Sequence, residues 1–127
     1  MIVDSSAIVA VCLEEPNHRI FIEKLLEAIS PKIAAPTLLE LYIVIEARRD
    51  PSLTQRADSM ISFLEVVPFD QELAEIARIA YRLYGKGTGH PAQLNFGDCF
   101  SYALSKRTGY PLLCAGNDFR QTDIRIA

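Results

Sequence analysis

The sequence has no tryptophan, only two histidines, and three cysteines that lie far apart. Cys12, Cys99 and Cys114 form no Cys-x-x-Cys pair and no cluster with the histidines, which argues against a zinc site or a dithiol redox pair. No apolar run approaches the ~18 residues that a membrane-spanning helix requires. A basic excess is missing as well, since 13 Lys and Arg face 16 Asp and Glu. A broad basic surface for duplex DNA is therefore not expected.

What is present is typical of one globular domain. Half of the 127 residues are apolar and 23% are charged, which is the ordinary range for such domains. A chain of this length buries enough surface to fold without disulfides or a structural metal. Residues 1–3 already have the composition of a strand, which leaves no room for a signal peptide. We expect a single domain over residues 1–127, a cytoplasmic location and no membrane association.

Strand and helix patterns alternate along the chain. Short apolar runs predict strands at residues 2–3, 32–35, 66–69 and 111–115. Helical periodicity predicts helices at about 5–13, 17–29, 37–49, 57–64, 73–84 and 96–107. Pro68 places the third strand near a sheet edge. The expected helix caps are Asn17, Thr37, Asp70 and, at a C-terminus, Gly109. This order predicts an α/β fold with parallel strands and helices on both faces.

Four acidic residues are predicted to approach one edge of that sheet. Asp4 directly follows the first strand, and Asp118 lies in the turn after the last. Glu40 is expected in the first turn of the helix after the second strand, and Asp98 in the first turn of the helix before the last strand. Ligands of open parallel sheets bind beyond the carboxyl ends of the strands. This edge is therefore the candidate functional site.

Each acid also has an ordinary structural explanation. Thr37 and Glu40 have the spacing of a capping box, and Asp98 in a first turn complements the helix dipole. Asp118 suits a turn, and Asp4 can cap the helix that follows it. The sequence leaves these explanations open beside the functional one.

Glu40 is the acid for which the structural explanation is weakest. It interrupts residues 38–45, which are otherwise almost entirely apolar and therefore expected to be buried. A buried carboxylate must be paired, protonated or metal-bound. Two like charges ~4 Å apart repel by about 4 kcal/mol at an effective dielectric constant of ~20. A divalent cation among the acids removes this conflict, and all-oxygen ligands suit Mg²⁺ or Mn²⁺.

Several segments together resemble a known family. They are Ile2 to Ala7 around Asp4, Glu40, the run from Leu94 to Ala103 around Asp98, and Gly116 to Phe119 followed by Thr122 to Ile124. These residues resemble PIN domains, and most closely the VapC toxins of bacterial type II toxin–antitoxin pairs. The resemblance extends over the whole chain.

The resemblance implies a three-layer α/β/α fold with a central, mostly parallel sheet of four to five strands. It implies a Mg²⁺-dependent endoribonuclease, with Mn²⁺ as a possible substitute, that forms a homodimer and is silenced by a VapB-type antitoxin. By position, Asp4 and Asp98 match the family's metal ligands. Glu40 matches the acid that completes the metal site, and Asp118 matches a more variable fourth acid. Asp123 is expected to be a structural acid.

Two surfaces are candidates for contact with macromolecules. The basic residues that are candidates to flank the acids and bind RNA are Lys86, Arg48, Arg49, Arg82 and Arg120. The helices at 17–29 and 37–49 carry more apolar residues than one core face requires. A groove for an antitoxin helix is one explanation, and a small core with a dimer face is the other. The residues concerned are Ile20, Phe21, Ile22, Leu38, Tyr42 and Ile45.

Two other functions compete with the ribonuclease. One is a catalytically silent PIN-like binding or regulatory module, which the intact set of acids argues against. The other is a phosphatase-like or receiver-like acidic site. Such sites need a second Asp two positions after the first or a Lys near the last strands. Here Ser5 and Ser6 follow Asp4, and Lys106 is predicted to lie within a helix.

Overall fold

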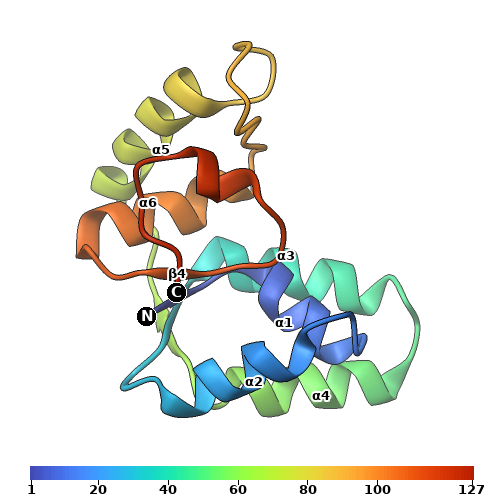
Figure 1. Cartoon of the computed structure of the whole chain (residues 1–127). Helices are drawn as coiled ribbons and strands as arrows, with labels where there is room; N and C mark the ends of the chain where they lie inside the picture. The colour runs from blue at the N-terminus through green and yellow to red at the C-terminus, as the bar shows by residue number, and fades with distance from the viewer.

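The computed structural model describes residues 1–127 and contains a four-stranded, fully parallel sheet (Figure 1). The strands are β1 (Ile2–Val3), β2 (Lys32–Ala34), β3 (Glu65–Val67) and β4 (Leu112–Leu113), in the spatial order β3-β2-β1-β4. Ile2 pairs with both Lys32 and Leu112, so β1 lies in the centre. β3 is an edge strand, as Pro68 predicts. The expected parallel α/β sheet is confirmed.

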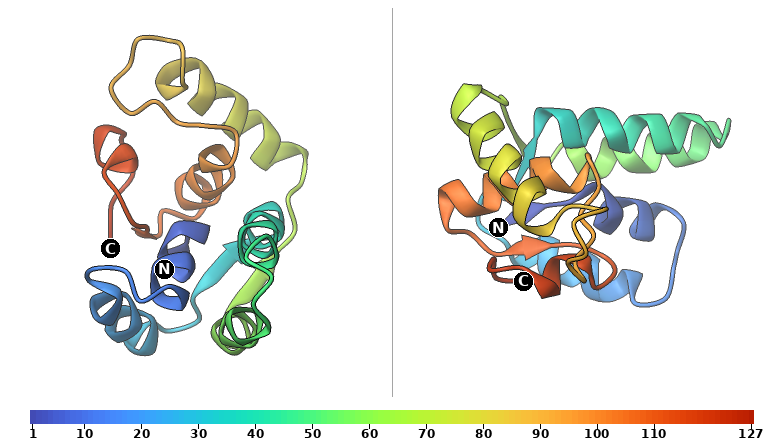
Figure 2. Two further views of the ribbon diagram at one scale, coloured as in Figure 1. Left: turned by 90° about the vertical axis from the view of Figure 1, so that its right-hand side faces the viewer. Right: turned by 90° about the horizontal axis from the view of Figure 1, so that it is seen from above.

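Helices cover both faces of this sheet, as Figures 1 and 2 show. The six α-helices are α1 (Ser5–Cys12), α2 (His18–Glu27), α3 (Ala35–Glu46), α4 (Pro51–Ile61), α5 (Gln71–Tyr84) and α6 (Asp98–Thr108). A short 3₁₀ helix, η1 (Asp118–Gln121), follows β4. The expected three-layer α/β/α architecture is therefore confirmed.

The hydrophobic core consists of two clusters, because side chains alternate between the two faces of the sheet along each strand. Ile2 and Leu112 face a cluster built mainly from α5 and α6. Val3 and Leu113 face a second cluster built from α1, α3 and α4. Successive strand residues point to opposite faces, so these two-residue strands each supply one side chain to each core. Both clusters anchor β1, which Asp4 follows, and the first anchors α6, which begins with Asp98.

Some expected helix caps are confirmed and others are wrong. Asp70 accepts a hydrogen bond from the Leu73 amide at 2.9 Å, and Gly109 ends α6 with a φ of 70°. Asn17 is itself left-handed and makes no capping bond. Thr37 is not a cap either, because α3 begins at Ala35 with Pro36 in its first turn. Proline is preorganised for a helix start, and this moves the N-terminus two residues upstream.

The chain after β4 extends the sheet slightly. The amide of Leu112 donates to Arg125 O at 2.8 Å, and the amide of Ala127 donates to Leu112 O at 2.8 Å. These bonds form a single parallel bridge between Leu112 and Ile126 beside β4. None of the helices is both long enough and apolar enough to span a bilayer.

Candidate active site

The structure brings the four predicted acids to the carboxyl edge of the sheet. Asp4 directly follows β1, Asp98 is the first residue of α6, and Asp118 is the first residue of η1. Glu40 lies in the second turn of α3, not the first, because that helix starts at Ala35. The capping box expected between Thr37 and Glu40 is therefore absent. Glu40 therefore makes no capping hydrogen bond to the backbone, and its carboxylate lies near the other acids.

Asp4 is the most deeply buried of the four, with 3% of its surface exposed. Its Oδ2 accepts hydrogen bonds from the Ser6 amide at 3.0 Å and the Ser6 hydroxyl at 2.6 Å. Its Oδ1 accepts one from Ser101 Oγ at 2.6 Å. A carboxylate that receives three donors is fixed in orientation, and one of its four lone-pair positions, on Oδ1, stays open. The helix-capping role expected of Asp4 is thus real, and it also aims the carboxylate.

Ser101 is a site residue that the sequence did not reveal. It is completely buried, and its hydroxyl lies 3.2 Å from that of Thr37. With its proton donated to Asp4, Ser101 accepts from Thr37, so a short hydrogen-bond chain links α3, α6 and β1. Its position one turn after Asp98, in a helix of buried residues, was the available signal. Ser6 adds a similar tie, because its hydroxyl accepts from the Ala115 amide at 3.0 Å.

Glu40 is held by a neighbour of Asp4. Ser5 Oγ donates to Glu40 Oε2 at 2.8 Å. Burial raises the pKa of Glu40 above its usual range, the Ser5 hydrogen bond opposes this, and the charge of Asp4 adds to the rise. Glu40 is therefore partly withdrawn from water near another acid, as expected. The expected burial of residues 38–45 as a whole is wrong, since Leu39 and Ile43 are 61% and 62% exposed.

Asp98, the first residue of α6, makes a reciprocal pair of hydrogen bonds with Asn95, which lies before the helix. The Asn95 amide donates to Asp98 Oδ2 at 2.7 Å, and the Asp98 amide donates to Asn95 Oδ1 at 2.9 Å. Burial raises the pKa of Asp98 to about 6. The Asn95 hydrogen bond opposes the rise, and the charges of Asp4, Asp118 and Glu40 add to it. Asp98 thus feels all three other acids, which places the four in one electrostatic environment.

Asp118 and Asp123 differ in their surroundings. Asp118 is exposed at the start of η1, and it is near enough to Asp98 to raise its pKa. Asp123 accepts hydrogen bonds from Tyr102 Oη and Lys106 Nζ, both at 2.6 Å. Asp123 is therefore the structural acid that the sequence predicts, and its negative charge is already compensated.

No Lys or Arg side chain forms an ion pair with any of the four site acids. Every ion pair in the protein lies elsewhere, and none includes Asp4, Glu40, Asp98 or Asp118. No three acidic, histidine or cysteine side chains already form a cluster with metal-binding geometry. The donor set is nevertheless all oxygen, partly buried and mutually repulsive, which fits a hard divalent cation such as Mg²⁺ or Mn²⁺. A cation bound there would draw the carboxylates closer together.

The basic candidates are spread over the surface. Arg48 and Arg49 follow the far end of α3, about 12 Å along the helix axis from Glu40, so they do not flank the acids. Arg120 lies in η1, two residues after Asp118. Lys86 lies in the loop between α5 and α6, at whose base the Lys86 amide donates to Leu94 O and the Leu94 amide donates to Tyr84 O, both at 2.9 Å. Arg120 is therefore the basic candidate that shares a short element with one of the acids.

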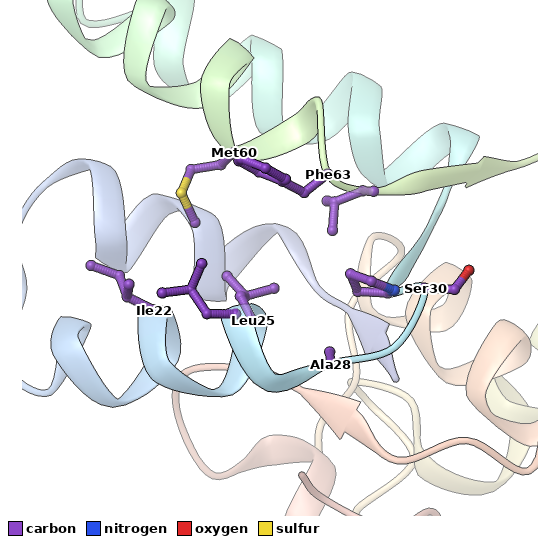
Figure 3. Close-up of a pocket in the computed structure, with 9 residues that line it drawn as sticks. Ile22, Leu25, Ala28, Ser30, Met60 and Phe63 are labelled. Atoms are coloured by element: carbon purple, nitrogen blue, oxygen red, sulfur yellow. The ribbon is translucent and has the colours of Figure 1, made fainter.

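The expected groove between α2 and α3 is wrong. These helices do not pack against each other, since α2 packs on α1 while α3 packs on α1 and α4. Ile45 is completely buried, and Tyr42 donates to Asp58 on α4 at 2.7 Å. An apolar pocket of about 380 Å³ lies instead between α2 and the end of α4 (Figure 3). The apolar side chains that line it are Ile22, Leu25, Leu26, Ala28, Pro31, Met60, Phe63 and Leu64.

Comparison with known structures supports the fold. The crystal structure of FitAcB from Neisseria gonorrhoeae superposes with a TM-score of 0.72 at 21% identity, covering 99% of this chain and 96% of that one. A toxin–antitoxin complex from Klebsiella pneumoniae gives a TM-score of 0.68 at 16% identity, covering 93% and 88%.

Sequence comparison identifies the family. Ribonuclease VapC42 of Mycobacterium tuberculosis is 42% identical over 129 residues, covering all of this chain and 98% of that protein. Ribonuclease VapC of Mycolicibacterium smegmatis is 40% identical over 126 residues, covering 98% and 97%. Residues 1–125 match the family model of the PIN domain. The chain therefore belongs to the PIN-domain family and, within it, to the VapC type.

Proposed function

We propose that this protein is the toxin of a type II toxin–antitoxin pair and hydrolyses RNA phosphodiester bonds in the cytoplasm with the help of Mg²⁺. In this proposal residues 1–127 form a single PIN domain. The observation that carries the proposal is the group of four acids at one sheet edge without any ion-pair partner. The relatives named ribonuclease supply the substrate class.

Asp4 and Asp98 are the proposed metal ligands. Asp4 is held rigidly by Ser6 and Ser101, and Asp98 Oδ1 is free while Oδ2 accepts from Asn95. Asp118 is proposed to complete the site from η1. A bound divalent cation supplies positive charge to the scissile phosphate and makes a neighbouring water more acidic.

Glu40 is proposed to orient the attacking water and accept its proton. Ser5 occupies Oε2, which leaves Oε1 for the water. The raised pKa of Glu40 suits this role, because a base with a pKa nearer neutrality accepts a proton and later releases it. The water oxygen would then bond to phosphorus as the bond from phosphorus to the ribose oxygen breaks, and the leaving ribose oxygen would take a proton from solvent.

The antitoxin is proposed to be of the VapB type, with an apolar segment bound in the pocket between α2 and α4 (Figure 3). Phe63 and Leu26 are 69% and 75% exposed there, and apolar side chains this exposed mark a contact surface. A structural neighbour titled as a toxin–antitoxin complex supports this partner class. A basic antitoxin side chain placed among the acids would neutralise them and compete with the metal. We also propose a homodimer as the active form.

Cleavage of single-stranded RNA by the purified protein tests the activity. We expect cleavage with Mg²⁺ or Mn²⁺, none with excess chelator, and a loss of at least about 10²-fold in the Asp98→Asn variant. Asp123→Asn is the matched control, because Asp123 also contacts α6 but is paired with Lys106 toward the other end of that helix. Equal cleavage by the wild type and Asp98→Asn would refute the proposal. A wild type that cleaves no RNA, with or without metal, would favour a silent binding module.

A further inference from the structure

Gly97 directly precedes Asp98 in the chain, and the Glu40 carboxylate occupies the space where a side chain of residue 97 would lie. A Cβ atom built on Gly97 would lie 2.2 Å from Glu40 Oε1, 2.8 Å from its Cδ and 3.0 Å from Oε2. Non-bonded carbon and oxygen atoms do not approach to 2.2 Å, so no side chain fits while Glu40 keeps this position. The Glu40 carboxylate thus occupies the space that a side chain at residue 97 would fill.

Backbone conformation does not explain the glycine. Gly97 has a φ of −63° and a ψ of −44°, which any residue adopts. It is buried just before α6, and an alanine with these ordinary angles would be favoured because it restricts the unfolded chain more than glycine does. Gly109 provides the contrast, because its φ of 70° requires the left-handed region. Local structure therefore favours alanine at residue 97, and only the contact with Glu40 opposes it.

We propose that Gly97 is a positioning residue that holds the Glu40 carboxylate in the acid site. Ser5 binds Oε2 from one side at 2.8 Å, and the open side of Gly97 receives Oε1 on the other. An alanine at residue 97 pushes the carboxylate out of this place and away from Asp4 and Asp98. This inference rests on the proposed function for its catalytic consequence, but the contact itself is independent of it.

The test combines Gly97→Ala, Glu40→Ala and the double variant in the full-length protein. For Gly97→Ala we expect kcat for RNA to fall by up to about 10²-fold, because misplacing a reacting group by ~1 Å costs this much. The KM for RNA stays within about twofold, since RNA binding elsewhere is untouched. Mn²⁺ affinity without RNA, measured by calorimetry, falls as well, because the displaced Glu40 charge, which acts on Asp98, no longer adds to the negative potential at the metal ligands. A kcat and an Mn²⁺ affinity both equal to wild type would overturn the proposal.

Thermal stability gives a readout that needs no activity. In the Glu40→Ala background the clash is gone, so adding Gly97→Ala raises the Tm, whereas in the wild-type background it leaves the Tm unchanged or lowers it. Should Gly97→Ala alone fail to fold, Glu40→Ala restores folding. An equal Tm change in both backgrounds would refute the contact, whatever the activity. A wild type that does not cleave RNA would refute the proposed function while the stability comparison still decides the role of Gly97.

Discussion

Ser101 on α6 donates a 2.6 Å hydrogen bond to Oδ1 of Asp4, 97 positions earlier in the chain. The bond is buried and joins the helix that carries Asp98 to the strand end that carries Asp4. Thr37 on α3 extends the chain to the helix that carries Glu40. Three acid-bearing elements are therefore tied together by two hydroxyl groups, which fixes the relative positions of the acids before any metal binds.

Loss of this tie is expected to lower both stability and activity. Ser101→Ala leaves one oxygen of buried Asp4 without a donor, which costs about 1–3 kcal/mol of unfolding free energy. RNA cleavage is expected to fall by roughly 10-fold or more, because groups that orient metal ligands contribute this much. Chemical denaturation and initial cleavage rates measure the two effects.

Ser105→Ala is the matched control for this prediction. Ser105 is also a buried serine of α6, and its hydroxyl donates to Tyr110 O at 2.7 Å, away from the acids. We expect a comparable loss of stability with wild-type cleavage. If Ser101→Ala and Ser105→Ala were equally active, Ser101 would have a purely structural role.

Removal of one site charge is expected to stabilise the metal-free protein. Burial, and after it the charges of Asp4, Asp118 and Glu40, raise the pKa of Asp98, so its ionised form is destabilised at neutral pH. Asp98→Asn keeps an oxygen that can accept from the Asn95 amide while it removes the charge. We expect the metal-free Tm to rise by roughly 3–5 °C for each ~1 kcal/mol of repulsion relieved. A lower Tm in metal-free buffer at pH 7.5 would show that the repulsion is unimportant.

The raised pKa of Asp98 also predicts how the unfolding free energy changes with pH. Asp98 has a folded pKa of about 6, against ~3.9 in an unfolded chain. Between these values the folded protein binds more protons, so its unfolding free energy falls as pH rises from ~4 to ~6. The Tm difference between Asp98→Asn and wild type should therefore grow over this window, whereas the stabilisation of the wild type by Mg²⁺ should appear only as pH approaches ~6 and above. A Tm difference that is constant with pH would contradict the raised pKa.

The apolar pocket between α2 and α4 predicts where the antitoxin binds. Phe63→Ser removes an exposed anchor and should weaken antitoxin binding by about 10-fold or more, without a change in RNA cleavage. Ile79→Ser on α5, also an exposed apolar position, is the control and should leave antitoxin affinity unchanged. Titration of each variant with its antitoxin measures the affinity. Equal affinities of all three proteins would exclude this pocket as the binding site.

The fold was predictable because its signals are local. The helix of residues 71–84 carries a clear apolar stripe and an Asp70 cap, and both features are found in the structure. The parallel order follows from strands separated by helices. The helix start at Ala35 was missed because Thr37 and Glu40 mimic a capping box, whereas Pro36 and the buried partner of Thr37 decide the outcome. Competing local signals of this kind are resolved only by tertiary contacts.

The approach of the four acids to one edge of the sheet was also predictable, but the residues that hold them in position were not. Asp4, Glu40, Asp98 and Asp118 follow from the rule that parallel strands end at one edge. Ser101 and Gly97 act through contacts with residues far away in the chain, and neither carries charge that would draw notice. The predicted groove failed for the same reason, because sequence shows that α2 and α3 are apolar but not that α1 and α4 lie between them.

The central claim is that these carboxylates form a divalent cation site, and anomalous scattering from a crystal soaked in Mn²⁺ tests it most directly. The account predicts an anomalous peak bound by Asp4 and Asp98, with Glu40 or Asp118 close by, and no such peak in a crystal of Asp98→Asn soaked in the same way. Ordered, metal-free carboxylates at this edge in the wild-type crystal, at a Mn²⁺ concentration that supports cleavage, would contradict it.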